Sequence, residues 1–182
     1  RKAQFIKSYC ASPDDARLYL YNLAHKLNIK LETGELDHRL KRYGLNPCLA
    51  AGTMVLTRYG PSKIEDLVWE TVEIFDGLSW VSTDTFRVTG ENEPTLKVTL
   101  ENGEVVIATV SHRFFGADGR TISAHQLQPG DVLMSVATIA PHYGRGFVVR
   151  SVVTNGRAEK VYCCTIPIRH RFTMASGLIS GN

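Results

Sequence analysis

The sequence contains no long hydrophobic run. No apolar stretch reaches the roughly 20 residues that a membrane-spanning helix needs, and the N-terminus lacks the charged-then-apolar pattern of a secretion signal. The 43% hydrophobic and 21% charged content is that of an ordinary globular protein, and 182 residues allow one or two domains. These features indicate a cytoplasmic protein without a membrane partner, and we expect it to be a monomer.

Cysteine is scarce, and the spacing of the cysteines argues against a zinc site and against a disulfide framework. The four residues are Cys10, Cys48, Cys163 and Cys164, and no C-x-x-C pair occurs. Neighbouring side chains of a strand point to opposite faces, so Cys163 and Cys164 are not expected to bind one zinc ion. A disulfide framework is not expected without a secretion signal. We therefore predict no metal or other cofactor, and at least one functional thiol.

The sequence also has little excess charge of one sign. Its formal net charge is +3. Residues 1–47 hold nine basic and five acidic residues, whereas residues 48–182 hold twelve and thirteen. Basic residues mixed with acidic ones are typical of a solvated helical surface, so we expect no nucleic-acid partner.

Residues 1–47 differ in character from the rest of the chain. Ser12 is a favourable N-cap, Pro13 fits the first turn of a helix, and leucines then recur at helical spacing as far as Leu27. A second helical run extends from Glu35 to Tyr43. Two short helices make a thin core, so we interpret residues 1–47 as a mostly helical fragment of a larger protein.

From residue 48 onward, short β-branched or aromatic runs alternate with predicted turns such as Asp76-Gly77, Pro129-Gly130 and Asn155-Gly156, which predicts an all-β domain. The Asn102-Gly103 pair predicts a hairpin from Leu96 to Thr109 with a type I′ turn. The predicted strands are Val68 to Phe75, Trp80 to Val88, Leu96 to Leu100, Val105 to Val110, Val132 to Ala137, Phe147 to Val153 and Val161 to Ile166.

Residues that can carry chemistry gather in three places in this β domain. The first is Cys48-Leu-Ala-Ala-Gly-Thr-Met-Val55, and the second is Thr109-Val-Ser-His112. The third comprises Val161-Tyr-Cys-Cys-Thr-Ile166, His170-Arg-Phe172 and Gly177-Leu-Ile-Ser-Gly-Asn182. Each group alone is a weak indication, because a core histidine or a buried cysteine would give the same pattern.

In this order and spacing, the three groups resemble the intein family of self-splicing proteins. They match its N-terminal block, its Thr-x-x-His block and its two C-terminal blocks, and residues 126–133 resemble a connecting segment of the same fold. The resemblance covers residues 48–182 and implies a horseshoe-like, all-β Hint fold, with residues 1–47 as an N-extein. The thirteen-residue connection from Ser135 to Phe147 leaves no room for a homing endonuclease, so the resemblance is to a class 1 mini-intein.

The resemblance assigns roles at the first junction. Cys48 would attack the carbonyl of Pro47 to form a thioester, which divides one difficult step into two easier ones. His112 would protonate the departing amide nitrogen, for which a pKa near neutrality is suitable, and we expect its imidazole to be partly exposed. Thr109 would orient the scissile carbonyl or donate a hydrogen bond to it.

The resemblance also assigns roles at the second junction. After acyl transfer to a nucleophile downstream, Asn182 would cyclise and release the intein, and His170 would assist. His170 lies between two arginines, so a solvated basic turn is the alternative interpretation.

Two positions depart from the family pattern. Gly181 stands where the family usually has histidine, so we expect a histidine restored there to speed C-terminal cleavage. Cys163 stands where the family usually has aspartate, and we interpret it either as a residue that transfers protons and couples the two junctions or as a plain core thiol.

The host protein is indicated only by the end of the first segment. Gly44-Leu-Asn-Pro47, followed after excision by a cysteine, would resemble the active-site region of ribonucleotide reductase large subunits. Flanking extein sequences of that host would be the only partners. The fixed φ of Pro47 should make the N-terminal junction slow, and we expect a trans Pro47–Cys48 peptide close to Thr109, His112 and Asn182.

Two other interpretations remain open. A Hint-type autoprocessing domain would cleave without ligation, although such domains do not need the terminal Asn182. Alternatively, an enzyme fragment would be fused to a non-catalytic β binding domain. Incubation with a small thiol separates this last possibility from the others, because only a reactive junction would release residues 1–47.

Overall fold

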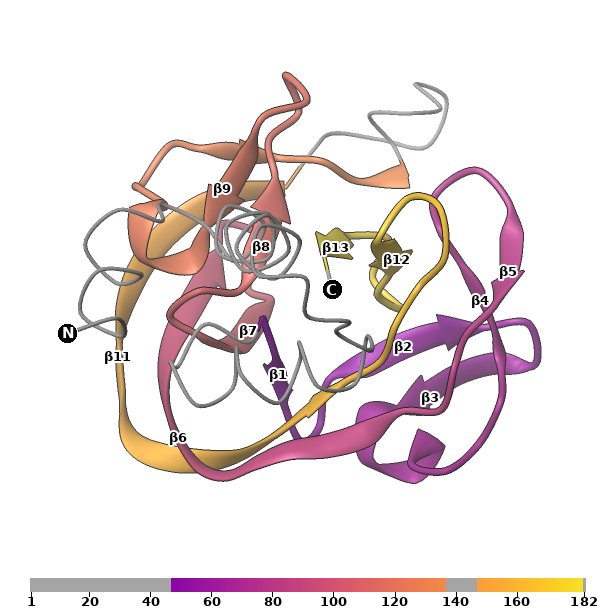
Figure 1. Ribbon diagram of the computed structural model, residues 1–182. Helices are drawn as coiled ribbons and strands as arrows, with labels where there is room; N and C mark the ends of the chain where they lie inside the picture. Colours follow the sequence, from indigo (N-terminus) through magenta and orange to yellow (C-terminus); the bar gives the residue numbers. More distant parts are fainter. Residues whose placement is uncertain (1–46, 137–146, 182) are drawn as a thin grey trace, which may run out of the picture. The chain divides into compact units, whose positions relative to one another are not determined.

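The computed structural model describes residues 47–136 and 147–181 (Figure 1). The chain divides between Asn46 and Pro47 into two units, and the described residues belong to the second. The two helices expected within residues 12–43 lie outside the described residues. Among the residues that are described, no helix is long and apolar enough to cross a membrane.

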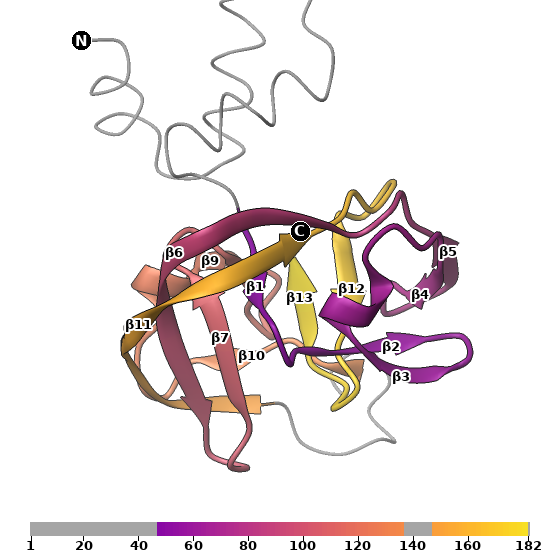
Figure 2. The same ribbon diagram turned by 90° about the horizontal axis from the view of Figure 1, so that it is seen from below.

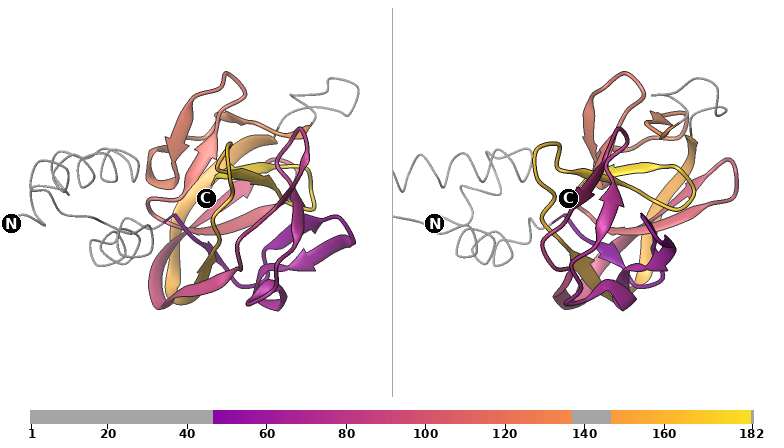
Figure 3. Two further views of the ribbon diagram at one scale, coloured as in Figure 1. Left: turned by 45° about the vertical axis from the view of Figure 1, so that its right-hand side comes forward. Right: turned by 90° about the vertical axis from the view of Figure 1, so that its right-hand side faces the viewer.

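The described residues form three antiparallel sheets (Figures 1 and 3). The first sheet contains β1 (Leu49–Ala50), β7 (Val105–Thr109), β6 (Arg87–Leu100), β11 (Phe147–Cys163) and β10 (Val132–Leu133), in that order. The second contains β12 (Arg171–Thr173), β13 (Ile179–Gly181), β8 (Arg113–Phe115) and β9 (Thr121–Ser123). The third contains β3 (Gly60–Lys63), β2 (Met54–Thr57), β4 (Glu73–Phe75) and β5 (Trp80–Ser82), and two 3₁₀ helices, η1 (Ile64–Leu67) and η2 (Ala124–Gln126), connect strands.

The short strand β1 closes four strands of the first sheet into a ring. Leu49 pairs with Ala108 of β7 on one side and with Tyr162 of β11 on the other. Both β7 and β11 also pair with β6, so β1 has no unpaired edge. In Figures 1 and 2, β1 and β13, from opposite ends of the described unit, lie near one another in its middle.

Strands β6 and β11 run side by side along the unit and are longer than the sequence predicts (Figure 2). The predicted strands from Phe147 to Val153 and from Val161 to Ile166 are joined into one strand that ends at Cys163. The Asn155-Gly156 pair, expected to be a turn, instead lies at one of four register shifts between β11 and β6. A bulge accommodates such residues and bends the strand without ending it.

Other predicted strand boundaries are also revised. The strand expected from Val68 to Phe75 is reduced to Glu73–Phe75, because η1 precedes it and Trp69 has a positive φ of 69°. The run from Trp80 to Val88 divides into β5 and the start of β6, and β10 comprises only Val132–Leu133. The sequence did not predict β1, β2, β3, β8, β9, β12 and β13.

The predicted hairpin is confirmed, but its turn type was wrong. Thr99 pairs with Val105, and the N–H of Leu100 donates to the carbonyl of Glu104. Gly103 has a φ of +89°, whereas Asn102 lacks the positive φ that a type I′ turn needs. The N–H of Gly103 donates to the Leu100 carbonyl, so the loop is a three-residue turn that ends in a left-handed glycine.

The core lies between the three sheets and is aromatic at its centre. Phe86 and Phe172 are buried and meet edge to face, with ring centroids 6.5 Å apart. Phe114 is also fully buried. Burial of one such side chain contributes about 1.5–3 kcal/mol. Phe86 immediately precedes β6, whereas Phe172 lies in β12 and Phe114 in β8, so these aromatic side chains anchor the three strands in the core.

Candidate functional site

Strand register places Cys48 between two other residues of interest. Because Leu49 pairs with Ala108 and with Tyr162, one step back along β1 brings Cys48 opposite Thr109 on one side and Cys163 on the other. The ring closure therefore brings together residues that are 61 and 115 positions apart in the sequence.

Thr109 holds the amide nitrogen of Cys48. The Cys48 N–H donates to Thr109 Oγ1 at 3.0 Å, and the Thr109 N–H donates to the Cys48 carbonyl at 3.0 Å. The Thr109 carbonyl, the usual strand partner of the Cys48 N–H, instead accepts from the His112 N–H at 3.0 Å. The Thr-x-x-His spacing is that of a β-turn, and this turn leaves the threonine hydroxyl as the partner of the scissile amide.

Cys163 contacts the other end of the same peptide bond. Its Sγ donates to the carbonyl oxygen of Pro47 at 3.2 Å. The Pro47–Cys48 peptide is trans and lies beside Thr109, as expected. Cys163 is therefore more than a core thiol, because it touches the carbonyl that Cys48 would attack.

Thr89 completes the surroundings of the Cys48 thiol, and sequence reasoning missed it. Its Oγ1 shares a hydrogen bond with Cys48 Sγ at 2.9 Å and donates to the carbonyl of Val161 at 3.2 Å. Val161 pairs with Gly90 and Tyr162 with Val88, so Thr89 is the extra residue of a β-bulge in β6. Bulges redirect side chains near active sites, and a glycine within a strand, as at Gly90, was the available indication.

The surroundings of Cys48 favour its protonated form. The pKa of Cys48 is raised well above its ordinary value. The causes are a hydrogen bond with the Cys163 thiol, then burial, then the charge that Cys163 can carry. The hydrogen bond with Thr89 opposes them and lowers it. Cys48 is therefore a thiol at neutral pH, and Thr89 is the contact that stabilises its thiolate.

His112 differs from its predicted state in two ways. Its exposed fraction is 1%, so the expected partial exposure was wrong. Burial, and then the charge of Arg113, lower the pKa of His112 to about 3, so the expected pKa near neutrality was also wrong. The imidazole is neutral at neutral pH, and as a general acid it could donate only a neutral ring N–H.

The ring of His112 reaches the C-terminal part of the chain. Its Nε2 shares a hydrogen bond of 2.7 Å with Oγ of Ser180, which is fully buried in β13. Its Nδ1 is buried and has no hydrogen-bond partner among the described residues. Ser180 was missed because a serine in a short strand carries no distinguishing sequence pattern. Its hydroxyl can either donate to or accept from Nε2, so both neutral tautomers of His112 can keep this contact.

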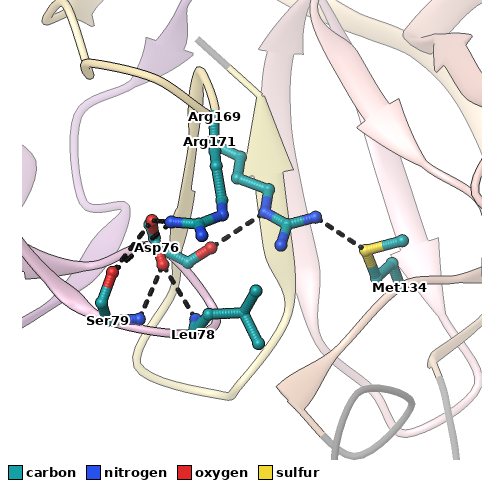
Figure 4. A network of polar contacts seen from close by, with 6 residues as sticks. All are labelled: Asp76, Leu78, Ser79, Met134, Arg169 and Arg171. Atoms are coloured by element: carbon teal, nitrogen blue, oxygen red, sulfur yellow. Dashed lines mark hydrogen bonds and ion pairs between the residues drawn. The ribbon is translucent and has the colours of Figure 1, made fainter.

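His170 lies just before β12, between Arg169 and Arg171 in the sequence. Figure 4 shows both arginines in contact with Asp76. Nη1 of Arg169 contacts Oδ2 of Asp76 at 2.7 Å, and Nε of Arg171 donates to the Asp76 carbonyl at 2.9 Å. The Asp76 side chain is fully buried. Burial acts to raise the pKa of the Asp76 carboxyl. Hydrogen bonds from the N–H groups of Ser79 and Leu78, together with Arg169, outweigh burial, so the pKa of Asp76 is lowered. Arg169 and His170 are exposed, and Arg169 lies in a turn, so the solvated basic turn of the alternative interpretation stays open even though both arginines contact Asp76.

Gly181 lies against backbone. A Cβ built at this position would be 2.9 Å from both the Cβ and the carbonyl oxygen of Arg113. Strand register pairs Gly181 with Arg171, the residue that follows His170. Asn182 lies outside the described residues, and the expectation that it lies close to the junction stays a prediction.

No group of three or more metal-ligating side chains occurs within residues 47–136 and 147–181. The site therefore consists of thiols, hydroxyls, an imidazole and backbone amides. Such groups can move an acyl group between nitrogen and sulfur and can hold the carbonyl while they do so.

Comparison with solved structures places this arrangement among known folds. The chain is similar to a DnaB intein from Synechocystis sp. PCC 6803, with 17% identity and a TM-score of 0.63 over 74% of this chain and 98% of the other. It is similar to a bacterial intein-like domain from Clostridium thermocellum, with 24% identity and a TM-score of 0.62 over 75% and 99%. It is also similar to the gp41-1 intein, with 17% identity and a TM-score of 0.60 over 74% and 98%.

No protein-family model and no curated protein matches the sequence. The structural likenesses establish the fold: the described residues adopt the horseshoe-like Hint fold of mini-inteins, as the sequence predicted.

Proposed function

We propose that residues 48–182 excise themselves by protein splicing and join the sequences that flank them. The observation that carries the proposal is the set of side chains that bind the Pro47–Cys48 peptide bond and the adjacent thiol. The N–H of the Pro47–Cys48 amide is held by Thr109, its carbonyl by Cys163, and the thiol beside it by Thr89. Any buried peptide bond needs hydrogen-bond partners, but backbone groups usually supply them. Here side chains that can donate or accept protons hold both its N–H and its carbonyl, as catalysis at that bond requires.

The first step is an acyl shift from nitrogen to sulfur. Cys48 Sγ attacks the Pro47 carbonyl carbon, the C–N bond breaks, and the proton from the thiol ends on the new amine, so atoms and charge balance. The S–H of Cys163 donates to the carbonyl oxygen as negative charge develops there. Neutral His112 supplies or relays the proton through a ring N–H, which is the form that its pKa of about 3 allows.

The later steps involve the C-terminal end of the chain. The acyl group passes to a nucleophile downstream of Asn182, and the side-chain amide of Asn182 then attacks its own carbonyl to release the domain. His170 assists from the position just before β12, where the contacts of Arg169 and Arg171 with Asp76 hold the backbone on both sides of it. Flanking extein sequences are the proposed partners, and the proposed protein acts as a cytoplasmic monomer without a cofactor.

The host is proposed to be a ribonucleotide reductase large subunit. The basis is the tail Gly44-Leu-Asn-Pro47, which would complete an Asn-Pro-Cys sequence if the first residue after excision is cysteine. The sequence of the ten or so residues that follow Asn182 tests both the host and the acceptor nucleophile.

The experiment that tests splicing uses a chain that continues beyond Asn182. Incubation with a small thiol should release residues 1–47 from the wild-type chain but not from a Cys48→Ala variant, because only the thioester is open to exchange. Asn182→Ala should stop release of the downstream segment while thiol-induced cleavage at Cys48 continues. Cleavage that is insensitive to Cys48→Ala would remove the basis of the proposal.

A second candidate is cleavage without ligation. The observation that favours it is the likeness to the intein-like domain from Clostridium thermocellum, at 24% identity. The products discriminate the two functions: splicing yields a joined flanking product, whereas simple autoprocessing yields separate fragments only.

A further inference from the structure

We propose that Cys48 and Cys163 also form a reversible disulfide, so that oxidation by a small disulfide such as glutathione disulfide switches the site off. The formation of this bond rests on the geometry of the two strands. Only its consequence for cleavage rests on the proposed function, and the two can be measured separately.

Strand register places the two cysteines directly opposite one another. Ala50 pairs with Val161 and Leu49 with Tyr162, so continuing the antiparallel register by one residue matches Cys48 with Cys163. The Ala51 N–H donates to the Lys160 carbonyl, which makes that pair a hydrogen-bonded one. Hydrogen-bonded and non-hydrogen-bonded pairs alternate, so Cys48 and Cys163 occupy a non-hydrogen-bonded pair.

A non-hydrogen-bonded pair has the dimensions of a disulfide. Its Cα atoms lie about 4.5 Å apart and its side chains approach closely. Disulfides occur at Cα separations of about 4.4–6.8 Å, so the bond could form without moving the backbone. The side chains already meet: both residues are thiols, their thiols share a hydrogen bond, and Cys163 Sγ lies 3.2 Å from the carbonyl oxygen of Pro47, the residue before Cys48.

The neighbouring Cys164 provides an internal contrast. It is also a thiol, but it belongs to the hydrophobic core, where it packs among residues such as Ile166 and Phe86. β11 ends at Cys163, whose half-buried thiol lies at the Pro47 carbonyl, whereas the Cys164 side chain is buried in the core. Packing therefore favours Cys163 over Cys164 as the partner of Cys48.

The oxidation proceeds by two thiol–disulfide exchanges. Cys163, which is half-buried, attacks glutathione disulfide as its thiolate, forms a mixed disulfide and releases one glutathione. Cys48, which is buried, then attacks Cys163 Sγ and releases the second glutathione. Two protein thiols are oxidised, one glutathione disulfide is reduced to two glutathione molecules, and the two thiol protons end on them.

This bond would stop the first step in two ways. It removes Cys48 Sγ as a nucleophile, and it removes the S–H that Cys163 donates to the Pro47 carbonyl. Reduction would restore both groups together. The junction would then react only after the protein meets reducing conditions.

The bond is tested by peptide mapping of the full chain after incubation with glutathione disulfide and alkylation of the remaining thiols. We expect one linked pair of peptides containing Cys48 and Cys163, with Cys164 alkylated. Cys163→Ser should abolish the linked pair, whereas Cys164→Ala and Cys10→Ser should retain it. A Cys163–Cys164 link, or a mixed glutathione adduct that never resolves, would overturn the proposal.

The switch is tested with hydroxylamine, which cleaves thioesters and leaves disulfides intact. Cleavage at Cys48 should be lost in the oxidised protein and recovered after treatment with a phosphine, which reduces disulfides without attacking thioesters. Unchanged cleavage in protein that carries the linked peptides would refute the switch. Absence of hydroxylamine cleavage in the reduced protein would instead count against the proposed splicing function, while peptide mapping would still decide whether the disulfide forms.

Discussion

At the scale of single residues, the site depends on hydrogen bonds that set protonation states. Cys48 is kept as a thiol by Cys163 and by burial, and only Thr89 acts in the opposite direction. His112 is kept neutral by burial, and Ser180 holds one of its nitrogens. Neither Thr89 nor Ser180 was predicted, because each acts through a partner far away in the sequence. Their importance follows only from the fold.

Replacing Thr89 should shift the pH dependence of thioester formation. Thr89→Val preserves the shape of the side chain but removes the hydrogen bond that lowers the pKa of Cys48. Hydroxylamine-induced cleavage should fall about tenfold at neutral pH, which corresponds to a hydrogen bond of about 1.4 kcal/mol, and the pH–rate curve should move to higher pH. Thr89→Ser should restore the wild-type curve. Equal rates in all three proteins at every pH would show that Thr89 has no influence on the thiol.

His112 should make the fold sensitive to acid. Its pKa is about 3 in the folded protein and 6.5 ordinarily, so between these values the unfolded chain binds a proton that the folded chain does not. Its contribution to stability is therefore complete above about pH 6.5 and is lost as the pH falls towards 3, by about 1.4 kcal/mol per pH unit. His112→Gln, measured by denaturant unfolding between pH 7 and pH 4, should have a shallower slope by about that amount. Identical slopes would mean that His112 is not buried in its neutral form.

At the scale of structural elements, the turn before β12 is held by one buried carboxylate. Asp76→Ala removes the partner of Arg169 and the acceptor of two backbone N–H groups, and we expect a loss of about 1.5–3 kcal/mol of unfolding free energy. Asp76→Asn keeps an acceptor and should lose less. C-terminal cleavage should slow in both variants, because Arg169, which precedes His170, loses its charged partner, while the contact of Arg171 with the Asp76 carbonyl remains. Asp118→Ala, which removes an exposed ion pair with Arg120, is the matched control and should change stability by less than about 0.5 kcal/mol.

The packing of β13 reverses one expectation drawn from the sequence. A histidine at position 181 was expected to speed C-terminal cleavage, but a Cβ there would lie 2.9 Å from the Arg113 carbonyl oxygen. We therefore predict that Gly181→His and Gly181→Ala each cost about 1–3 kcal/mol of unfolding free energy and slow C-terminal cleavage. Both quantities are measured on a chain that continues beyond Asn182. A histidine variant that is as stable as the wild type and cleaves faster would restore the original expectation.

At the scale of the whole described unit, the sequence predicted those features that depend on neighbouring residues, such as the β-strand content. Short β-branched runs predicted an all-β domain, and the resemblance of the groups around Cys48, Thr109 and Cys163 to the intein blocks implied that they share a site. The Asn155-Gly156 pair was misread because the same dipeptide fits a turn or a bulge, and the choice depends on the partner strand. The burial of His112 was missed for a related reason, since burial is a property of packing rather than of local sequence.

The double pairing of β1 has a consequence for what remains after the reaction. The pairs that Leu49 and Ala50 make with β7 and β11 all lie on the downstream side of the Pro47–Cys48 bond. Breaking that bond removes none of these pairs, so the new chain end stays within the ring. The spent domain should resist proteases as well as its precursor does, and limited digestion of the two should give the same pattern for residues 48–182. The by-product of a single turnover would then persist as a folded protein, and its removal would require active degradation.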